Sequence, residues 1–467
     1  MLHSFRALAL GAGLLTAGLH AQPFDDATLN HSDRLRDHAL QSDIAWQVVE
    51  SLTTEVGPRL AGTEGDARAV AWAKARFEAM GFDAVRLEPV TVPHWERGYA
   101  DAQVTLPFPQ PLVISALGNS VPTPEGGIEA RIVRFDTLAD LEAADPAQVK
   151  GKLAFIDHKM ERFKDGRGYG PVVKARGRGA VAAAQKGAVG LLLRSVSTSS
   201  HRFAHTGVMR YVDGVAKIPA AAISPPDADQ LTRMLARQDD IQVKLELASM
   251  DKGQTTSYNV IGEIRGRSQP EEIVVIGAHL DSWDEGTGAL DDGAGVGIVT
   301  AAAQHILDLE QRPARTVRVV LYAAEEIGLI GAKAYRDHHQ ADLDNHYIAA
   351  EADFGAGPIY RLDSRVNEAA RPAIEAMVAQ MAPLGVTLGH NHSWGGPDVS
   401  VLPPLGVPVA GLNMDGTDYF DYHHTPDDTL DKIDPEAIRQ SAAVYTLFAW
   451  LMANADSTLR PIPPTTN

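Results

Sequence analysis

The sequence predicts an α/β protein in which a three-layer α/β/α domain, built on a mostly parallel sheet, contains an inserted β-rich module. After Tyr258, near-continuous apolar strands alternate with helices, the pattern of a parallel sheet that is covered on both faces. Between residues 120 and 252 the chain consists instead of short strands broken by turns. The 467 residues also exceed what one hydrophobic core usually organises, so at least two domains are expected.

Residues 1–21 have the features of a signal peptide. Arg6 precedes an apolar run over residues 7–19, and Leu19-His20-Ala21 approximates a small-residue cleavage site. We expect cleavage after Ala21 and export, so that the protein is periplasmic or secreted. The alternative, an uncleaved membrane anchor, is disfavoured because a spanning helix needs about 20 apolar residues. Residues 22–41 are polar and rich in aspartate, and they are expected to form a mobile leader.

Residues 42–119 are expected to form the N-terminal part of the larger domain. A helix is predicted from Ser42 to about Val56, where GPRLAGTEG breaks it. A second helix is predicted from Asp66 to Met80, because apolar residues recur there at helical spacing and Gly81 is placed to end it. The alternation over residues 85–92 predicts a strand.

The inserted module is predicted over residues 120–252, and the rest of the larger domain over residues 253–460. The module's strands read IEARIVRF, GKLAFID, GLLLRS, KIPAAAIS and IQVKLELAS, with helices near 173–186 and 226–237. The strands of the larger domain read EEIVVIGAH, TVRVVLYAAEE, HYIAAEAD and PVAGLN, and a helix over 435–453 closes it. This alternation places the carboxyl ends of the second set of strands at a common edge.

Composition excludes several classes of function. Cysteine is absent, so disulfides and thiolate chemistry are excluded, and any metal must be held by His, Asp and Glu. The formal net charge of −18 argues against nucleic acid and anionic membranes as partners. After the signal peptide no apolar run is long enough to cross a bilayer, so no stable membrane insertion is expected once it is cleaved.

Six ionisable side chains follow the predicted strands of the larger domain. They are His279, Asp281, Glu325, Glu326, Asp353 and His424. The carboxyl ends of parallel strands share one edge of an open sheet, where ligands bind, so we expect these side chains to converge on one crevice. Asp291, which with Asp292 opens the helix after the first strand, faces the same edge and can join the cluster.

This cluster predicts a site for two metal ions. So many carboxylates would repel one another unless cations lay between them, and two divalent ions about 3.5–4 Å apart resolve the conflict. Asp291 is expected to bridge the two ions. His279 and Asp353 complete one site, and Glu326 and His424 complete the other. With only His and carboxylate ligands, zinc is the first choice, and cobalt or manganese could substitute.

Glu325 and Asp281 are expected to act beside the ligands. Adjacent residues of an extended segment point to opposite sides, so if Glu326 is a ligand, Glu325 faces the substrate. There it can take a proton from the bridging water and deliver it to the leaving amine. Asp281 can hold the other imidazole nitrogen of His279. Each residue alone has a plainer interpretation, such as a helix cap at Asp291, but their coincidence at successive strand ends favours the metal site.

Four motifs, GAHLDSWDEGTGALDDGAG, LYAAEEIGLIGA, EADFG and YHHTPDDTLDKIDP, occur in this order over residues 270–435. By these motifs the chain resembles the co-catalytic zinc aminopeptidases, and most closely the plasma glutamate carboxypeptidase (carboxypeptidase Q) branch. Residues 57–82 look like the family's N-terminal helical portion, the inserted module resembles a protease-associated domain, and residues 393–408 look like the branch's substrate loop.

The resemblance implies a set of functional residues. The family's ligands fall on His279, Asp291, Glu326, Asp353 and His424, its general base on Glu325, and its histidine-orienting carboxylate on Asp281. His423 remains an alternative to His424. His390 and His392 are expected to be solvated loop residues.

The resemblance also implies an activity. Members of the family remove one residue at a time from short peptides, often dipeptides with a free N-terminus, and the closest branch implies a homodimer. Three alternatives on the same scaffold stay open: a carboxypeptidase, a glutaminyl cyclase-like enzyme with one metal ion, and a non-catalytic receptor-like module. The inserted module is expected to be a structural lid or an assembly surface, with a direct role in substrate choice as the alternative.

Overall fold

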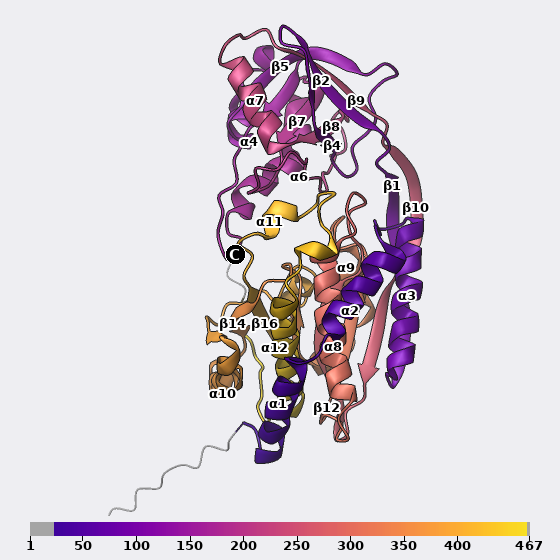
Figure 1. Cartoon of the computed structure of the whole chain (residues 1–467), viewed down its shortest axis with the longest axis vertical. Coiled ribbons are helices and arrows are strands. Elements are labelled where there is room, and N and C mark those ends of the chain that lie inside the picture. The colour runs from indigo at the N-terminus through magenta and orange to yellow at the C-terminus, as the bar shows by residue number, and fades with distance from the viewer. Residues whose placement is uncertain (1–22, 465–467) are drawn as a thin grey trace, which may run out of the picture.

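The computed structural model describes residues 23–464, so the predicted signal peptide lies outside the described residues. The chain folds into a lower domain and an upper module, each with its own eight-stranded sheet (Figure 1). The chain enters the upper module through β1 (Ala84–Glu96) and leaves it through β10 (Met250–Ile264), which pair with each other as an antiparallel ribbon. The upper module is therefore an insertion between two neighbouring strands of the lower sheet.

The sheet of the lower domain is mixed, with a parallel centre. Its order is β1-β10-β12-β11-β13-β16-β14-β15. The bounds of the other strands are β11 Gln269–His279, β12 Arg315–Tyr322, β13 His346–Glu351, β14 Ile359–Arg365, β15 Thr387–Leu388 and β16 Val409–Met414. β11 is parallel to β12 and β13, and β13 to β16, whereas β10 is antiparallel to β12 and β14 to β16. Parallel pairing is thus concentrated in four central strands, the ones that carry the predicted site residues.

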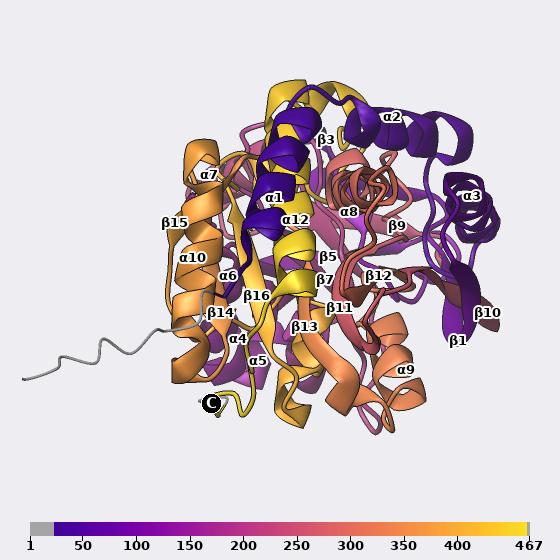
Figure 2. The same cartoon turned by 90° about the horizontal axis from the view of Figure 1, so that it is seen from below.

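Helices cover both faces of this sheet (Figure 2). On one face lie the almost wholly buried α8 (Ala294–Leu307) and α12 (Pro435–Asn454), with α2 (Ile44–Ser51) packed outside α8. On the other face lies α9 (Ile330–His338), whose Ala332 and Tyr335 share a core with the apolar side chains of β11 and β12. The remaining helices of this domain include α3 Glu64–Met80, α10 Arg371–Met381 and the short α11 Tyr419–Tyr422. The lower domain is therefore a three-layer α/β/α structure.

The segment expected to be a mobile leader forms a helix instead. Helix α1 (Asp26–Ala39) begins with Asp25, whose side chain accepts a hydrogen bond from the Thr28 main-chain nitrogen. Buried side chains recur along one face of the helix at Thr28, Ser32, Leu35 and Ala39. The indole of Trp450 in α12 donates to the Thr28 carbonyl at 3.0 Å. The prediction was wrong because one face of small and apolar side chains in a polar sequence suffices once α12 covers it.

The upper module begins earlier than the sequence predicted. Its sheet has the order β3-β2-β9-β5-β6-β7-β8-β4. The bounds are β2 Ala100–Leu106, β3 Gln110–Leu112, β4 Ile114–Ala116, β5 Ile128–Phe135, β6 Leu153–Ile156, β7 Gly190–Arg194, β8 Ala220–Ile223 and β9 Gln242–Leu247. Its helices are α4 Leu138–Ala143, α5 Pro146–Val149, α6 Tyr169–Gln185 and α7 Pro225–Leu235. The predicted boundary at 120 was late, because β2 and β4 pair with β9 and β8, which follow it in the sequence, and β3 pairs with β2.

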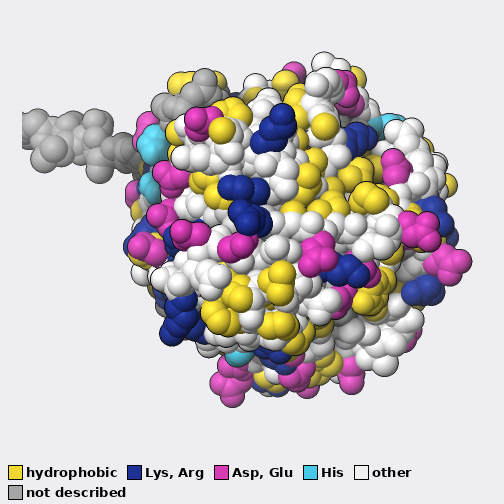
Figure 3. All heavy atoms as spheres, turned by 90° about the horizontal axis from the view of Figure 1, so that it is seen from above, with side chains coloured by type: hydrophobic (Ala, Val, Ile, Leu, Met, Phe, Trp, Pro, Cys, Tyr) yellow, Lys and Arg dark blue, Asp and Glu magenta, His cyan; other side chains and the backbone are white. Residues whose placement is uncertain are grey.

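Seen from above, the end of the molecule formed by the upper module presents acidic, basic and apolar side chains side by side (Figure 3). Within residues 23–464, no helix combines the length and the apolar character that crossing a bilayer requires.

Candidate functional site

Asp291 lies between two histidines that are far apart in the sequence. Its Oδ1 is 3.1 Å from His279 Nε2, and its Oδ2 is 3.1 Å from His424 Nε2. His279 ends β11, Asp291 lies in the kinked segment just before α8, and His424 follows α11. The two oxygens of one carboxylate therefore face two different imidazoles, which is the arrangement expected of a bridging ligand.

Each histidine has a second carboxylate beside it. Asp353 Oδ1, just after β13, is 3.7 Å from His279 Nε2. Glu326 Oε2, after β12, is 3.0 Å from His424 Nε2. The five side chains predicted as metal ligands are thus brought together, in the two groups that the sequence predicted.

The donor set fits metal ions. Asp291 Oδ2 and Glu326 Oε1 are buried, and neither receives a hydrogen bond within the described part of the chain. His424 Nε2 lies close to Asp291 Oδ2 but not in hydrogen-bonding geometry. Buried carboxylate oxygens without donors are costly unless a cation neutralises them. All donor atoms are oxygen or imidazole nitrogen, which suits zinc.

Electrostatics agree with this fit. Burial alone would lower the pKa of His279, but the carboxylates around it raise that pKa well above its usual value. Burial alone would lower the pKa of His424, but the carboxylates of Glu326 and Asp291 raise it to about 9. Burial raises the pKa of Asp291, but the neighbouring imidazoles of His279 and His424 bring it well below its usual range. Protons on the imidazoles thus balance the cluster, and metal ions would replace them.

Glu325 and Glu326 follow β12 in a loop, not in the extended segment expected. The backbone turns at Ala324, which has a φ of 55°, a left-handed conformation that is uncommon outside glycine. Glu326 is buried and its Oε2 accepts a hydrogen bond of 2.7 Å from the Trp283 indole. Glu325 is partly exposed and lines the cavity of the site. Both side chains reach the site, and they differ in their contacts instead of pointing to opposite sides.

Asp281 contacts both His279 and Glu325, but not in the way the sequence predicted. Its main-chain carbonyl lies 2.9 Å from His279 Nδ1, whereas its carboxylate Oδ1 is 3.6 Å from that nitrogen. The carboxylate instead accepts a hydrogen bond from the Glu325 main-chain N–H at 3.0 Å. The chain turns directly after β11, so the carbonyl of Asp281 folds back onto the imidazole and leaves the carboxylate free for the next loop.

The structure places both histidines of the pair 423–424 near the cluster. Their rings stack with centroids 3.4 Å apart. His423 Nε2 is 3.6 Å from Asp291 Oδ2, farther than His424, and His424 alone of the two also contacts Glu326. The Nδ1 of His424 lies 3.2 Å from the Thr206 carbonyl. Donation to that carbonyl would leave Nε2 as the nitrogen that binds a metal ion.

Several supporting residues were not singled out from the sequence. The Asp428 carboxylate accepts hydrogen bonds from the main-chain nitrogens of Leu290 at 2.6 Å and Asp291 at 3.2 Å. The buried guanidinium of Arg59 donates to the carbonyls of Leu280, Thr287 and Gly288. Both residues occur inside motifs that the sequence analysis quoted, but their partners are main-chain groups, which leave no pattern in a sequence.

The upper module covers the cluster and encloses a cavity of about 390 Å³. The cavity floor carries the ligand carboxylates and Glu325, and its roof carries Tyr169 and Arg176 from α6. A neighbouring cavity of about 380 Å³ shares Trp394 with the first and is lined by His390 and His392, which are exposed as expected. The segment predicted as a substrate loop thus contributes to both cavities.

Arg176 brings a positive charge into an otherwise acidic cavity. Its side chain is 6% exposed, and it is the one Arg or Lys among the described residues that line the cavity. Nη2 donates to the Tyr169 hydroxyl at 2.7 Å, and Nη1 lies 3.3 Å from His424 Nδ1. Its Nε is buried without a hydrogen-bond partner in the described part of the chain.

Comparisons with known proteins match the whole architecture. Peptidase family M28 matches residues 259–449. Carboxypeptidase Q of Mus musculus is 36% identical over 408 residues, which span 87% of this chain and 85% of that protein. A solved structure of a peptidase M28 precursor from Shewanella amazonensis SB2B is 60% identical, with a TM-score of 0.93 over 94% of this chain and 99% of that one. BSAP, a zinc aminopeptidase from Bacillus subtilis, shares the fold with a TM-score of 0.64 at 20% identity, over 86% of this chain and 93% of that one.

Proposed function

The chain belongs to peptidase family M28, and from this premise we propose that it is an exported di-zinc exopeptidase that hydrolyses short peptides or dipeptides with a free N-terminus. The observation that supports the proposal most directly is the position of Asp291, with one oxygen 3.1 Å from each of His279 and His424. A single metal site would not require both oxygens of this carboxylate to face separate histidines.

The residues that would hold the ions are His279 and Asp353 for one, Glu326 and His424 for the other, and Asp291 for both. A protein of the same fold is named a zinc aminopeptidase, and the donor set here suits zinc. When bound, zinc supplies a Lewis acid that polarises the scissile carbonyl and lowers the pKa of water.

Glu325 is the proposed general base. Its carboxylate lines the cavity beside the ligands, and within the described residues it has no hydrogen-bond donor that would hold it away from the reacting groups. Burial and the nearby carboxylates of Asp353 and Glu326, against the effect of His279, raise its pKa well above the usual value. A carboxylate with a raised pKa is a stronger base toward water than an ordinary glutamate, and its protonated form can then donate to the leaving amine.

The cavity also favours a short substrate. Carboxylates beside the reaction site suit the ammonium group of a free N-terminus, as do acidic side chains such as Asp165 at the cavity wall. At the roof, Arg176 provides a cation with an unpaired Nε, which suits the C-terminal carboxylate of a dipeptide. A cavity of about 390 Å³ has room for a substrate of the size of a dipeptide.

A carboxypeptidase is the second candidate, because relatives named carboxypeptidase Q match most of the chain and because Arg176 is placed where a free carboxylate could bind. The glutaminyl cyclase-like and receptor-like alternatives receive less support, since both histidines and all three carboxylates of the predicted ligand set are present together. Export rests on the sequence of residues 1–21, and we propose a periplasmic or secreted homodimer.

The test uses the purified protein and a panel of dipeptides, tripeptides and their N-acetylated forms. We expect activity on free dipeptides, loss of activity with a chelator, recovery with zinc, and two zinc ions per chain by elemental analysis. Equal turnover of free and N-acetylated peptides would favour the carboxypeptidase. Hydrolysis that persists after complete metal removal would contradict the metallopeptidase mechanism.

A further inference from the structure

We propose that Glu88, His338 and His339 form an additional site for a divalent transition-metal ion, with zinc as the preferred ion, at the edge of the lower sheet and separate from the catalytic cluster. Glu88 lies in the edge strand β1, His338 is the last residue of α9, and His339 follows it. A carboxylate and two imidazoles are ligands that zinc and its neighbours in the first transition row bind well.

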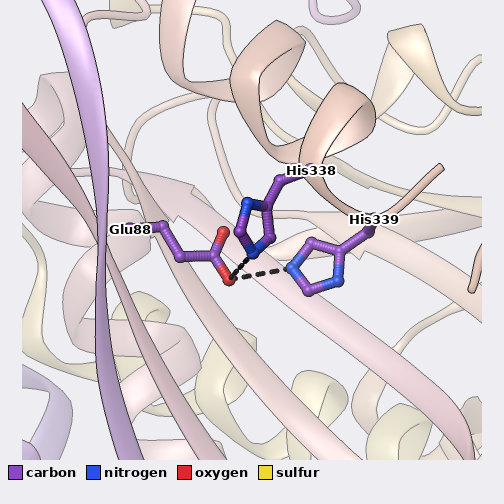
Figure 4. A group of neighbouring side chains, drawn as sticks. All are labelled: Glu88, His338 and His339. Atoms are coloured by element: carbon purple, nitrogen blue, oxygen red, sulfur yellow. Dashed lines mark hydrogen bonds and ion pairs between the residues drawn. The ribbon is translucent and has the colours of Figure 1, made fainter. Parts of the chain in front are cut away.

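The three side chains converge on one point. Glu88 Oε1 is 2.9 Å from His339 Nε2 and 3.9 Å from His338 Nε2. Figure 4 shows the two imidazole rings approaching the same carboxylate oxygen from adjacent positions at the end of the helix. Potential ligand atoms of the three residues all lie within 4.8 Å of one another. An ion bound at about 2.0–2.2 Å from each ligand therefore requires only small rotations, mainly of the more exposed His338.

The carboxylate of Glu88 lacks a permanent positive partner. Its side chain is largely buried, with 7% of the residue exposed, and its Oε2 is buried without a hydrogen-bond donor among the described residues. Within residues 23–464, its ion-pair contacts are with the two histidines and not with a Lys or Arg. A neutral imidazole supplies one hydrogen bond but no charge, so the buried carboxylate stays incompletely compensated. A divalent ion would compensate it.

The site also has an entrance. The side chain of His338 is 63% exposed, so an ion can reach the carboxylate from solvent and keep water as a fourth ligand. His339 is held on the inner side, where its ring packs on Tyr335 with centroids 4.4 Å apart. One buried and one exposed imidazole suit a site that is filled and emptied as metal availability changes.

An ion here would join the edge strand of the lower sheet to a helix that packs on the same sheet. Strand β1 pairs with β10, and together they form the ribbon that continues from the lower sheet into the upper module (Figure 1). Helix α9 directly follows the loop of Glu325 and Glu326. Binding would therefore fasten the base of the ribbon to the helix that follows the catalytic loop, and would stabilise the folded state increasingly as the free metal concentration rises above the dissociation constant.

The experiment counts metal ions on the full chain. Wild type, His338→Ala and the control His94→Ala are dialysed to equilibrium against buffered free zinc, and bound zinc is measured by elemental analysis. His94 is a matched control because it lies in the same strand, 3.3 Å from Glu96, but has no second histidine in that contact. We expect wild type and His94→Ala to bind one more ion per chain than His338→Ala.

Because the comparison is between variants that all retain the catalytic ligands, it is independent of how many ions the catalytic cluster holds. Circular dichroism and the melting temperature in chelator verify that His338→Ala is folded; since this residue is exposed, we expect both to match wild type. Zinc should then raise the melting temperature of wild type more than that of His338→Ala. Equal zinc counts and equal zinc-dependent shifts in all three proteins would overturn the proposal.

Discussion

The carboxylate of Asp281 accepts a hydrogen bond from the main-chain N–H of Glu325, with 3.0 Å between Oδ1 and the nitrogen. The carbonyl of the same aspartate lies 2.9 Å from His279 Nδ1. One residue thus orients both an imidazole of the cluster and the loop of the proposed base. Because that loop begins with the left-handed Ala324, a fixed partner for its first N–H helps to hold a conformation that costs about 1–3 kcal/mol.

Replacing Asp281 with Ala removes the acceptor for the Glu325 N–H, whereas Asn retains a carbonyl oxygen at the same place. We expect Asp281→Ala to lower kcat about 10- to 100-fold and Asp281→Asn to lower it less. Steady-state kinetics at saturating zinc measures the difference. Identical losses in the two variants would show that the charge of Asp281, and not its hydrogen bond to the loop, is what matters.

Glu325 and Glu326 should differ sharply when each is replaced by glutamine. Glu325→Gln should lower kcat by roughly a hundredfold or more while zinc content stays unchanged, because a general base is lost and no ligand is. Glu326→Gln should lose zinc, because the group beside His424 is no longer a carboxylate. Elemental analysis and kinetics on both proteins make the test, and a Glu325→Gln protein with full turnover would refute the proposed mechanism.

Trp283 should tune metal affinity without touching a metal. Its indole donates to Glu326 Oε2 at 2.7 Å and orients that carboxylate toward His424. We expect Trp283→Phe to weaken zinc binding about tenfold or more while the protein remains folded. Competition with a chromogenic chelator measures the affinity, and circular dichroism monitors the fold. Unchanged affinity would mean that Glu326 is oriented by the surrounding packing alone.

Arg176 should distinguish substrates by their C-terminus. If its guanidinium binds a substrate carboxylate, Arg176→Gln should raise KM for dipeptides about tenfold or more, the magnitude of a charged hydrogen bond, and leave the corresponding dipeptide amides nearly unaffected. Arg178→Gln is the control, because that side chain lies on the same helix and is 70% exposed. A uniform loss on acids and amides would assign Arg176 to the support of His424 instead.

Acid should destabilise the protein through His346. Burial, with the nearby charge of Arg318, lowers the pKa of His346 to about 3, and its Nε2 lies 2.8 Å from the Tyr335 hydroxyl. Below about pH 6.5 the unfolded chain binds a proton at this histidine and the folded chain does not, so stability is lost as pH falls from about 7 toward 3. At pH 5 the loss is about 2 kcal/mol.

The variant His346→Gln can still accept from the tyrosine but does not titrate, so its melting temperature should fall less between pH 7.5 and 5 than that of wild type. The exposed His392→Gln should follow wild type. Parallel pH profiles for wild type and His346→Gln would contradict the prediction.

Much of the candidate site could be predicted because it follows a general rule of parallel sheets. His279 is the last residue of β11, and Glu326 and Asp353 follow β12 and β13 within a few residues; the carboxyl ends of these strands share an edge. The rule says nothing about contacts that are made by main-chain groups or by side chains of the upper module. The Asp281 carbonyl, the Thr206 carbonyl and Arg176 therefore could not be placed from residue types and spacing.

The fold was predictable to a similar degree. Buried helices and strands such as α12 and β12 appear as long apolar segments, and their positions agree with the prediction. The helix α1 was missed because its buried face includes Thr28 and Ser32 and so gives little apolar periodicity. The strands β2 to β4 were assigned to the wrong part because pairing of β2 and β4 with distant β9 and β8 decides their membership. Tertiary contacts, and not local propensity, determine both features.

The upper module does more than cover the cavity. Its Thr206 carbonyl meets the imidazole of His424, and its His205 Nδ1 lies 2.7 Å from the carbonyl of His423. If the upper module tilted about the β1–β10 ribbon, it would displace the loop that carries His424, a proposed zinc ligand. The same motion would widen the entrance for a peptide. The open state that admits a peptide and the closed state that hydrolyses it would then exclude each other. A truncated protein without the module would be inactive.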